Sequence, residues 1–326
     1  DGRLYVLVSR QQPGSFNEVY LAALAPETGK VFWSRHIASS SASAYQQAGD
    51  ASGETVIPAG QRVIVTDGMG VIAAISSLDG SIEWARMFAS DLQPVRGRRA
   101  MFAPVQQSDV SPPRHVAAVL CDAGLIVPVT WRQDDHGAMR VDPASGQVLN
   151  ETLPAAGDNI MATASLAGDL LTLDAEQGLT RLDGRTLKVV WRQPVADVDV
   201  GAQLDAAGSL IVVATEKQLQ LRDAATGEIK QTQPLASPAR LHLTPGQLVL
   251  TQGETISSFM AWDLALQRLA RQMQQQPHNP DPGLALARMG WNERKDDHMF
   301  AGLDHALDAA NDAVLRDDDA VQQQVF

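Results

Sequence analysis

The chain has 326 residues, of which 44% are hydrophobic and 20% charged, and this ordinary globular composition suggests about two domains. Lysine and arginine number 26 against 38 acidic residues, a net charge of −12, which argues against a nucleic-acid-binding protein because such proteins carry a basic face. Cys121 is the single cysteine, which excludes an internal disulfide, a cysteine-rich zinc site and a redox pair.

The sequence opens with Asp1 rather than methionine and enters a predicted strand at residues 4–8. We therefore expect a processed chain or a fragment, whose targeting signals would lie upstream. The longest apolar region, residues 115–131, is interrupted by Asp122, Gly124 and Pro128. It predicts two short strands joined at residues 122–124 rather than a transmembrane segment.

Five segments along the chain share one short pattern. The reference position holds a glycine in four copies and leucine in the fourth, with spacings of 51, 66, 41 and 40 residues. Two positions later every copy has valine or isoleucine, and four positions later three copies have tryptophan. In chain order the reference residues are Gly29, Gly80, Gly146, Leu187 and Gly227; the tryptophans are Trp33, Trp84 and Trp191; and aspartate precedes the reference by four positions at Asp142, Asp183 and Asp223.

Each position of the pattern has a physical role in a turn between two strands. Aspartate, threonine and serine side chains can accept or donate hydrogen bonds within a tight turn, and glycine supplies a positive φ where the chain reverses. The β-branched residue begins the next strand, on the face that it shares with the later tryptophan. Leu187 replaces the glycine of the fourth copy, so that turn is expected to have a different geometry or to be strained.

Strands flank these turns at even spacing. Three in a row are predicted around the second, fourth and fifth copies: residues 62–66, 70–76 and 82–88; 170–174, 178–182 and 188–192; and 210–214, 219–222 and 228–232. A fourth strand between units completes four-stranded blades, which is typical of a β-propeller. A β-sandwich is the alternative all-β fold, but a register kept over five copies favours radial repetition.

The pattern Asp-x-x-Thr-Gly-x-x-x-Trp resembles the tryptophan-docking motif of the pyrroloquinoline-quinone (PQQ) repeat family, over about residues 1–260. In that family the motif locks neighbouring blades together. About six blades are visible, and because family propellers often have seven or eight, we expect further blades upstream of an incomplete first one. The resemblance implies a structural, blade-docking role for Gly29, Trp33, Gly80, Trp84, Gly146, Asp183, Trp191, Asp223 and Gly227.

Residues 261–326 are expected to form a separate helical tail. Trp262, Leu266, Leu269 and Met273 recur at helical spacing, and Pro277 ends that helix. Two further helices, about residues 282–291 and 297–315, form a pair that resembles one tetratricopeptide unit. We predict a helix N-cap at residue 281, whose side chain would cap the helix. Residues 281–326 also contain ten acidic and four basic residues, half of the net charge.

Catalytic members of the PQQ family bind the quinone with Ca²⁺. Many carry a vicinal cysteine pair, and they use a tryptophan stacked on the quinone, carboxylate and asparagine metal ligands and an aspartate base. Cys121 alone cannot form the pair, and the three repeat tryptophans are assigned to docking. The sequence therefore predicts no catalytic, cofactor-binding or metal-binding residue and no cofactor. The alternative is a fragment of a PQQ-dependent oxidoreductase whose catalytic residues lie in missing blades.

The family also contains non-catalytic lipoproteins that take part in outer-membrane β-barrel assembly, and resemblance to them implies a scaffold for protein–protein interaction in the bacterial cell envelope or periplasm. The expected partners are other proteins in a larger complex, with no nucleic acid and with membrane contact only indirect or through a lipid anchor outside this sequence. The insertion at about residues 89–113 explains the 66-residue spacing. Its Arg96, Arg98 and Arg99 are the candidate partner contact; the alternatives are an ordinary exposed loop or a contact with lipid headgroups.

Overall fold

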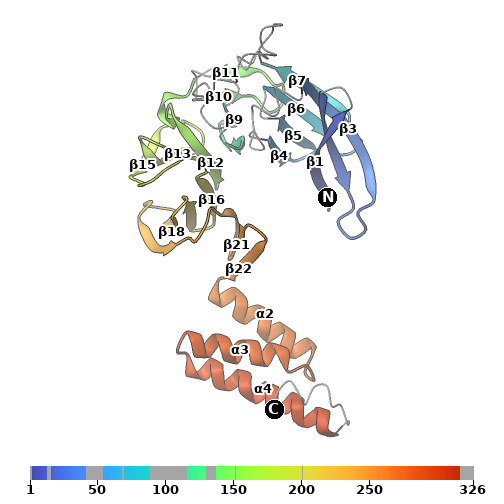
Figure 1. Cartoon of the computed structure of the whole chain (residues 1–326), viewed down its shortest axis with the longest axis vertical. Helices are drawn as coiled ribbons and strands as arrows, with labels where there is room; N and C mark the ends of the chain where they lie inside the picture. The colour runs from blue at the N-terminus through green and yellow to red at the C-terminus, as the bar shows by residue number, and fades with distance from the viewer. Residues whose placement is uncertain are drawn as a thin grey trace, which may run out of the picture. The chain divides into compact units, whose positions relative to one another are not determined.

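A computed structural model of the chain describes residues 2–12, 16–41, 54–67, 70–88, 116–129, 137–150, 152–199 and 201–315. It divides into two compact units, one of Asp1–Pro245 with Val249–Ser257 and one of Gly246–Leu248 with Ser258–Phe326. In Figure 1 the first unit carries the strands and the second, in orange to red, carries the helices.

Six sheets follow one another along the described residues, and we number them as the first to sixth blade. The first blade contains β1 (Leu4–Gln12), β2 (Phe16–Leu24) and β3 (Val31–Ser41); the second contains β4 (Glu54–Ala59), β5 (Arg62–Asp67), β6 (Val71–Ser76) and β7 (Ile82–Met87). The third contains β8 (Val119–Cys121), β9 (Gly124–Pro128), β10 (Ala138–Val141) and β11 (Val148–Asn150). The fourth contains β12 (Ile160–Leu166), β13 (Asp169–Asp174), β14 (Gly178–Leu182) and β15 (Val189–Gln193). The fifth contains β16 (Gln203–Ala207), β17 (Leu210–Ala214), β18 (Gln218–Asp223) and β19 (Ile229–Pro234), and the sixth contains β20 (Arg240–Thr244), β21 (Gln247–Gln252) and β22 (Thr255–Met260).

The predicted fold class, a mainly β propeller of four-stranded blades with a helical C-terminal appendage, is confirmed. In each four-stranded blade the strands lie side by side in chain order, so that the last strand forms the outer edge of its sheet. The two strands predicted within residues 115–131 are β8 and β9, joined at residues 122–123.

Consecutive blades pack face to face through apolar side chains. The second and third strands of the four-stranded blades are largely buried on both faces; in β13, for example, Leu170, Leu171 and Leu173 have no exposed surface. One cluster joins the fourth and fifth blades through residues such as Leu179 and Ile211. Similar clusters join the first and second, second and third, and third and fourth blades. Each face therefore depends on the blade next to it for burial.

The first blade corresponds to the second, third and fourth strands of a complete blade. Its turn at residues 25–30 leads into β3, just as the turn at residues 76–81 leads into β7. Leu4 pairs with Leu24, the residue before the turn, and Val63 pairs with Ile75 at the same place in the second blade. Strand β1 is thus the counterpart of β5, and it lies at the edge of its three-stranded sheet.

The helical unit contains α2 (Trp262–Gln275), α3 (Asp281–Asn292) and α4 (Asp296–Leu315). Helices α3 and α4 approach closely because glycines lie between them: a Cβ at Gly290 would be 2.5 Å from the Met299 backbone nitrogen. The predicted side-chain cap at Asp281 is wrong. Helix α3 already includes Asp281, its N-cap is Pro280, and the side chain of Asn279 accepts a hydrogen bond from the Asp281 N–H at 3.0 Å.

No helix among the described residues is long and apolar enough to span a membrane.

Candidate functional site

The turn before the outer strand, which we call the docking turn, has the same backbone geometry in the first five blades. The carbonyl of the residue four positions before the reference accepts a hydrogen bond from the reference N–H. The N–H of that same residue donates to the carbonyl of the residue after the reference. These pairs are Gly29 to Ala25 (2.8 Å) and Ala25 to Lys30 (2.9 Å), Gly80 to Ser76 (3.0 Å) and Ser76 to Ser81 (2.8 Å), Gly146 to Asp142 and Asp142 to Gln147 (both 2.8 Å), Leu187 to Asp183 (2.8 Å) and Asp183 to Lys188 (2.9 Å), and Gly227 to Asp223 and Asp223 to Glu228 (both 2.8 Å).

Aspartate side chains bind the backbone of these turns, as predicted. The carboxylate of Asp223 accepts hydrogen bonds from the Ala225 and Thr226 N–H groups at 2.8 and 3.0 Å, and Asp183 accepts from Thr186 in the same way. Hydrogen bonds from the Thr186 side chain and backbone lower the pKa of Asp183. In the second blade, Asp79 performs this function from another position, and hydrogen bonds from the Ser81 backbone and side chain lower its pKa to about 2.

Each repeat tryptophan lies on the docking turn of the following blade. A Cβ added to Gly80 would be 2.6 Å from the Trp33 ring, one at Gly146 would be 2.5 Å from the Trp84 ring, and one at Gly227 would be 2.6 Å from the Trp191 ring. The absence of a side chain therefore lets the indole approach the turn. The Trp33 Nε1–H donates to the Ser77 carbonyl at 3.2 Å, and that of Trp84 donates to the Pro143 carbonyl at 3.1 Å.

The docking contact of Trp191 differs in one hydrogen bond. The corresponding carbonyl, that of Ala224, accepts from Arg181 at 2.8 Å, and Trp191 Nε1 is buried without a partner among the described atoms. That the indole contacts hold the blades together stays a prediction, which variants of these tryptophans can test.

Sequence analysis missed a second side chain in the same contact. Two positions after the tryptophan, Arg35 donates to the Gly80 carbonyl at 2.6 Å and Arg86 donates to the Gly146 carbonyl at 3.1 Å. In the fifth blade's docking turn, Gln193 donates to the Thr226 carbonyl at 2.9 Å. The spacing Trp-x-Arg or Trp-x-Gln in the outer strand was the available signal.

The junction of the third and fourth blades replaces both partners. Asn150 on β11 occupies the tryptophan position, and Leu187 occupies the glycine position with φ +55°. The sequence predicted either a different turn geometry or strain at Leu187. Because the turn keeps the common hydrogen bonds and Leu187 has a positive φ, the prediction of strain is the one that applies. Leu187 packs beside Leu153 and Ala155 against the core of these two blades, and it lines a cavity of about 280 Å³ together with Asn150.

The predicted partner contact, Arg96, Arg98 and Arg99, lies outside the described residues. Cys121 is buried, and burial raises the pKa of its thiol. Among the described residues no group of three or more His, Cys, Asp or Glu side chains is placed to hold a metal ion.

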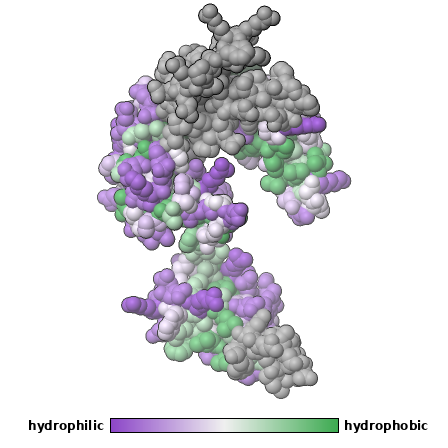
Figure 2. Space-filling model, viewed as in Figure 1, coloured by the Kyte–Doolittle hydropathy of each residue, from purple (hydrophilic) through white to green (hydrophobic). Residues whose placement is uncertain are grey.

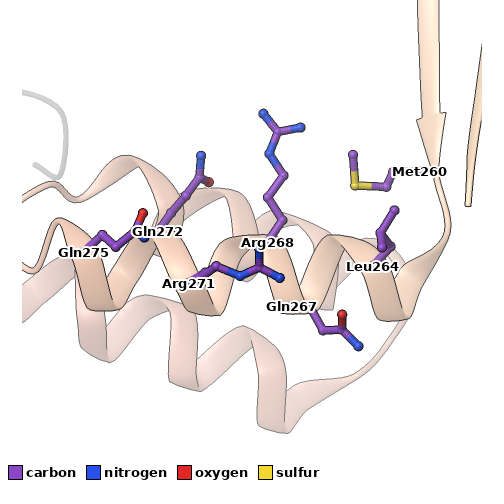
Figure 3. Close-up of a pocket in the computed structure, with 7 residues that line it drawn as sticks. All are labelled: Met260, Leu264, Gln267, Arg268, Arg271, Gln272 and Gln275. Atoms are coloured by element: carbon purple, nitrogen blue, oxygen red, sulfur yellow. The ribbon is translucent and has the colours of Figure 1, made fainter. Parts of the chain in front are cut away.

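An open groove lies along α2 in the helical unit. Its volume is about 320 Å³, and Met260 and Leu264 lie side by side at one end, with Arg268 and Arg271 farther along the helix (Figure 3). The groove combines an apolar end with two guanidinium groups. Trp262, at the start of α2, packs instead within the unit, where the Lys295 ammonium lies 3.9 Å from the centre of its ring.

A model of the family described as "Outer membrane protein assembly factor BamB" matches residues 6–152. The resemblance to the PQQ-like repeat family is confirmed. The match covers the docking turns of the first three blades, with their glycines Gly29, Gly80 and Gly146. No curated protein sequence matches the chain significantly.

Three solved structures illustrate the likeness. BamB from Moraxella catarrhalis is 13% identical, with 76% of this chain and 82% of that chain covered and a TM-score of 0.42. The computationally designed protein Ika8 is 10% identical, covers 78% and 71% of the two chains, and has a TM-score of 0.48. The WD40 domain of Neurospora crassa Pan2 is 14% identical, covers 64% and 60%, and has a TM-score of 0.42.

Proposed function

We propose that this protein is a non-catalytic propeller scaffold for protein–protein interaction, a subunit or accessory of a larger assembly in the bacterial cell envelope. The observation that carries the proposal is the family match to an outer membrane assembly factor over the blades whose tryptophans lie on the next docking turn. Blades fixed in this way would present their connecting loops in a constant arrangement, and a loop held by a rigid framework loses little conformational entropy on binding.

The insertion between the second and third blades is the proposed contact surface. Arg96, Arg98 and Arg99 place three positive charges on a chain whose net charge is −12. Oppositely charged surfaces attract one another during encounter and suppress wrong partners. An acidic surface of a partner protein is therefore the expected target of this loop.

Charge reversal tests this contact. The variant in which Arg96, Arg98 and Arg99 are all changed to Glu should lose the proteins that co-purify with the wild type, because three favourable charge pairs become repulsive. A matched control changes Arg185, Lys217 and Arg294, which are exposed elsewhere, to Glu and gives the same net charge. If the loop variant keeps every partner that the control keeps, this loop is not the contact surface.

The alternative function, part of a PQQ-dependent oxidoreductase, makes a separate prediction. Mixing the purified full-length protein, with any blades that lie outside residues 1–326, with PQQ and Ca²⁺ should then change the quinone absorbance and support reduction of an electron-accepting dye in the presence of an alcohol or sugar. The scaffold proposal expects neither change. Dye reduction that depends on PQQ would overturn it.

A further inference from the structure

The junction between the third and fourth blades contains a cavity where three other junctions hold an indole. At those three junctions a tryptophan ring lies on the docking turn of the next blade. Here Asn150 occupies the tryptophan position and Leu187 the glycine position, and both line a cavity of about 280 Å³. An apolar cavity of about 150 Å³ is known to hold a benzene molecule, so this volume is sufficient for a bicyclic aromatic ring.

The walls of the cavity suit a flat apolar group. Leu187 packs with Leu153 and Ala155 against the core of the two blades, and the buried Leu182 also lines the cavity. Asn150, on the same wall, is exposed, so the cavity can be entered from solvent. The visible face of the fourth and fifth blades is mainly hydrophilic in Figure 2. An accessible cavity with apolar walls is typical of a site for a small ligand.

One cationic side chain lines the same cavity. Arg140 on β10 pairs across the sheet with Asn150, just as Arg181 on β14 pairs with Trp191. The two arginines therefore occupy equivalent positions in consecutive blades. Their hydrogen bonds can be compared directly, because the only difference in their cross-strand partners is the presence or absence of the indole.

The guanidinium of Arg181 is fully engaged, whereas that of Arg140 is not. Arg181 binds the Asp169 carboxylate through Nη2 at 2.6 Å and donates from Nη1 to the Ala224 carbonyl at 2.8 Å. Arg140 donates from Nε to the Ala123 carbonyl at 2.7 Å, and among the described residues it has no ion pair and its Nη groups have no acceptor. The Nε contact orients the guanidinium, and the two Nη groups remain to bind a carboxylate, which accepts such paired donors.

We propose that this cavity binds a small aromatic carboxylic acid, whose ring fills the space of the missing indole and whose carboxylate pairs with Arg140. The apolar walls select the ring, and the unpaired guanidinium selects the anionic group. The ligand is a free molecule rather than a side chain of a partner protein, because no protein side chain combines an aromatic ring with a carboxylate. This inference goes beyond the proposed scaffold function and does not depend on it.

The tryptophans of the described residues do not line this cavity. Those of the repeat lie on the other docking turns, and Trp262 and Trp291 belong to α2 and α3. Trp131 lies outside the described residues. Its indole is the internal competitor that the experiment must distinguish from a free ligand, and a variant of Trp131 is therefore included.

Isothermal titration calorimetry of the full chain with indole-3-acetate tests the proposal. This probe carries a bicyclic ring and a carboxylate, and indole-3-acetamide is its uncharged counterpart of similar shape. We expect saturable binding of one indole-3-acetate per chain. The amide should bind at least about tenfold more weakly, because a hydrogen bond between two charged groups is stronger than one to a neutral acceptor.

Substitutions then locate the binding. Arg140→Gln should weaken the binding of indole-3-acetate at least about tenfold, whereas Arg288→Gln, which removes an exposed positive charge on α3, should leave it unchanged. The double variant Asn150→Trp with Leu187→Gly should not bind the probe, because an indole of the protein then occupies the cavity. Circular dichroism checks that each variant is folded, and the two arginine variants decide the test if the double variant is not.

Several results would each overturn the proposal: no saturable binding to the wild type, equal affinities for indole-3-acetate and its amide, equal affinities of Arg140→Gln and Arg288→Gln, or unchanged binding in a folded double variant. Binding that appears only after Trp131→Ala would also overturn it, since the chain's own indole would then fill the cavity. None of these results affects the charge-reversal test of the arginine loop. A failure of this inference is therefore distinguishable from a failure of the proposed function.

Discussion

Replacing Trp84 and Trp191 by phenylalanine, one at a time, should have different effects on stability. Both indoles lie on a glycine of the next blade, so both variants lose similar contact area. Trp84 Nε1–H donates to the Pro143 carbonyl at 3.1 Å, whereas Trp191 Nε1 is buried without a partner among the described atoms. Phenylalanine therefore removes a hydrogen bond at one position and an unsatisfied donor at the other.

The two effects have opposite signs and measurable sizes. A lost hydrogen bond destabilises by about 0.5–1.5 kcal/mol, and an unsatisfied buried donor costs about 1–3 kcal/mol that the substitution at Trp191 would recover. Trp84→Phe should therefore destabilise the protein by about 1.5–4.5 kcal/mol more than Trp191→Phe does. Urea unfolding followed by far-ultraviolet circular dichroism measures this difference through the midpoint, provided that the slope is unchanged.

The explanation of Trp191 names a competitor for its acceptor. Arg181 donates to the Ala224 carbonyl, which corresponds to the carbonyl that Trp84 uses. If the free energies of unfolding of Trp84→Phe and Trp191→Phe agree within about 0.5 kcal/mol, the limit of ordinary additivity, or if Trp191→Phe is the less stable variant, this explanation is refuted.

Three further predictions concern the docking turns. Gly146→Ala should destabilise the protein by about 1–3 kcal/mol more than Gly29→Ala, since both add a Cβ at positive φ but only the first meets an indole; thermal unfolding of the two variants gives the difference, and equal losses would contradict it. The folded-state pKa of Asp79 is lowered from 3.8 to about 2, so its stabilising contribution is present above pH 3.8 and is lost as the pH falls towards 2; the unfolding midpoint of Asp79→Asn should fall less over this range, and identical pH profiles would argue against it. The double variant Asn150→Trp with Leu187→Gly should be more stable than the sum of its single variants implies, because each needs the other to form the contact; a double-mutant cycle with no coupling energy would show otherwise.

Much of the fold could be predicted from the sequence because the repeat combines a turn with the strands on either side. The glycine or leucine reference and the β-branched residue after it fix where each outer strand begins, and β14 begins and ends at the predicted residues. A fourth strand was expected in each blade, but the residues of β12 were not predicted, because the sequence from Ile160 to Leu166 has few turn signals and alternates weakly. Burial by two neighbouring blades, a tertiary effect, decides such segments.

The candidate site was predictable only in part. Tryptophan and glycine at fixed spacing identify a motif, but not which glycine each indole contacts, because the partners lie in different blades. The hydrogen bonds of Arg35 and Arg86 to those turns depend on the same arrangement. The helix start at Asp281 was misplaced by one residue because Asn279 offers a competing side-chain acceptor.

The contact between blades is directional. Each of the three repeat tryptophans is on the outer strand of one blade, and the glycine that it contacts is in the docking turn of the next blade. The two surfaces that form the contact, the tryptophan and the turn, are therefore different. Such heterologous contacts have no twofold symmetry, and they can be repeated indefinitely unless rotation closes them into a ring. A mutation of the tryptophan can therefore be compensated only on the following blade, and a mutation of the turn only on the preceding blade, so each repeat is coupled to its two neighbours through different residues.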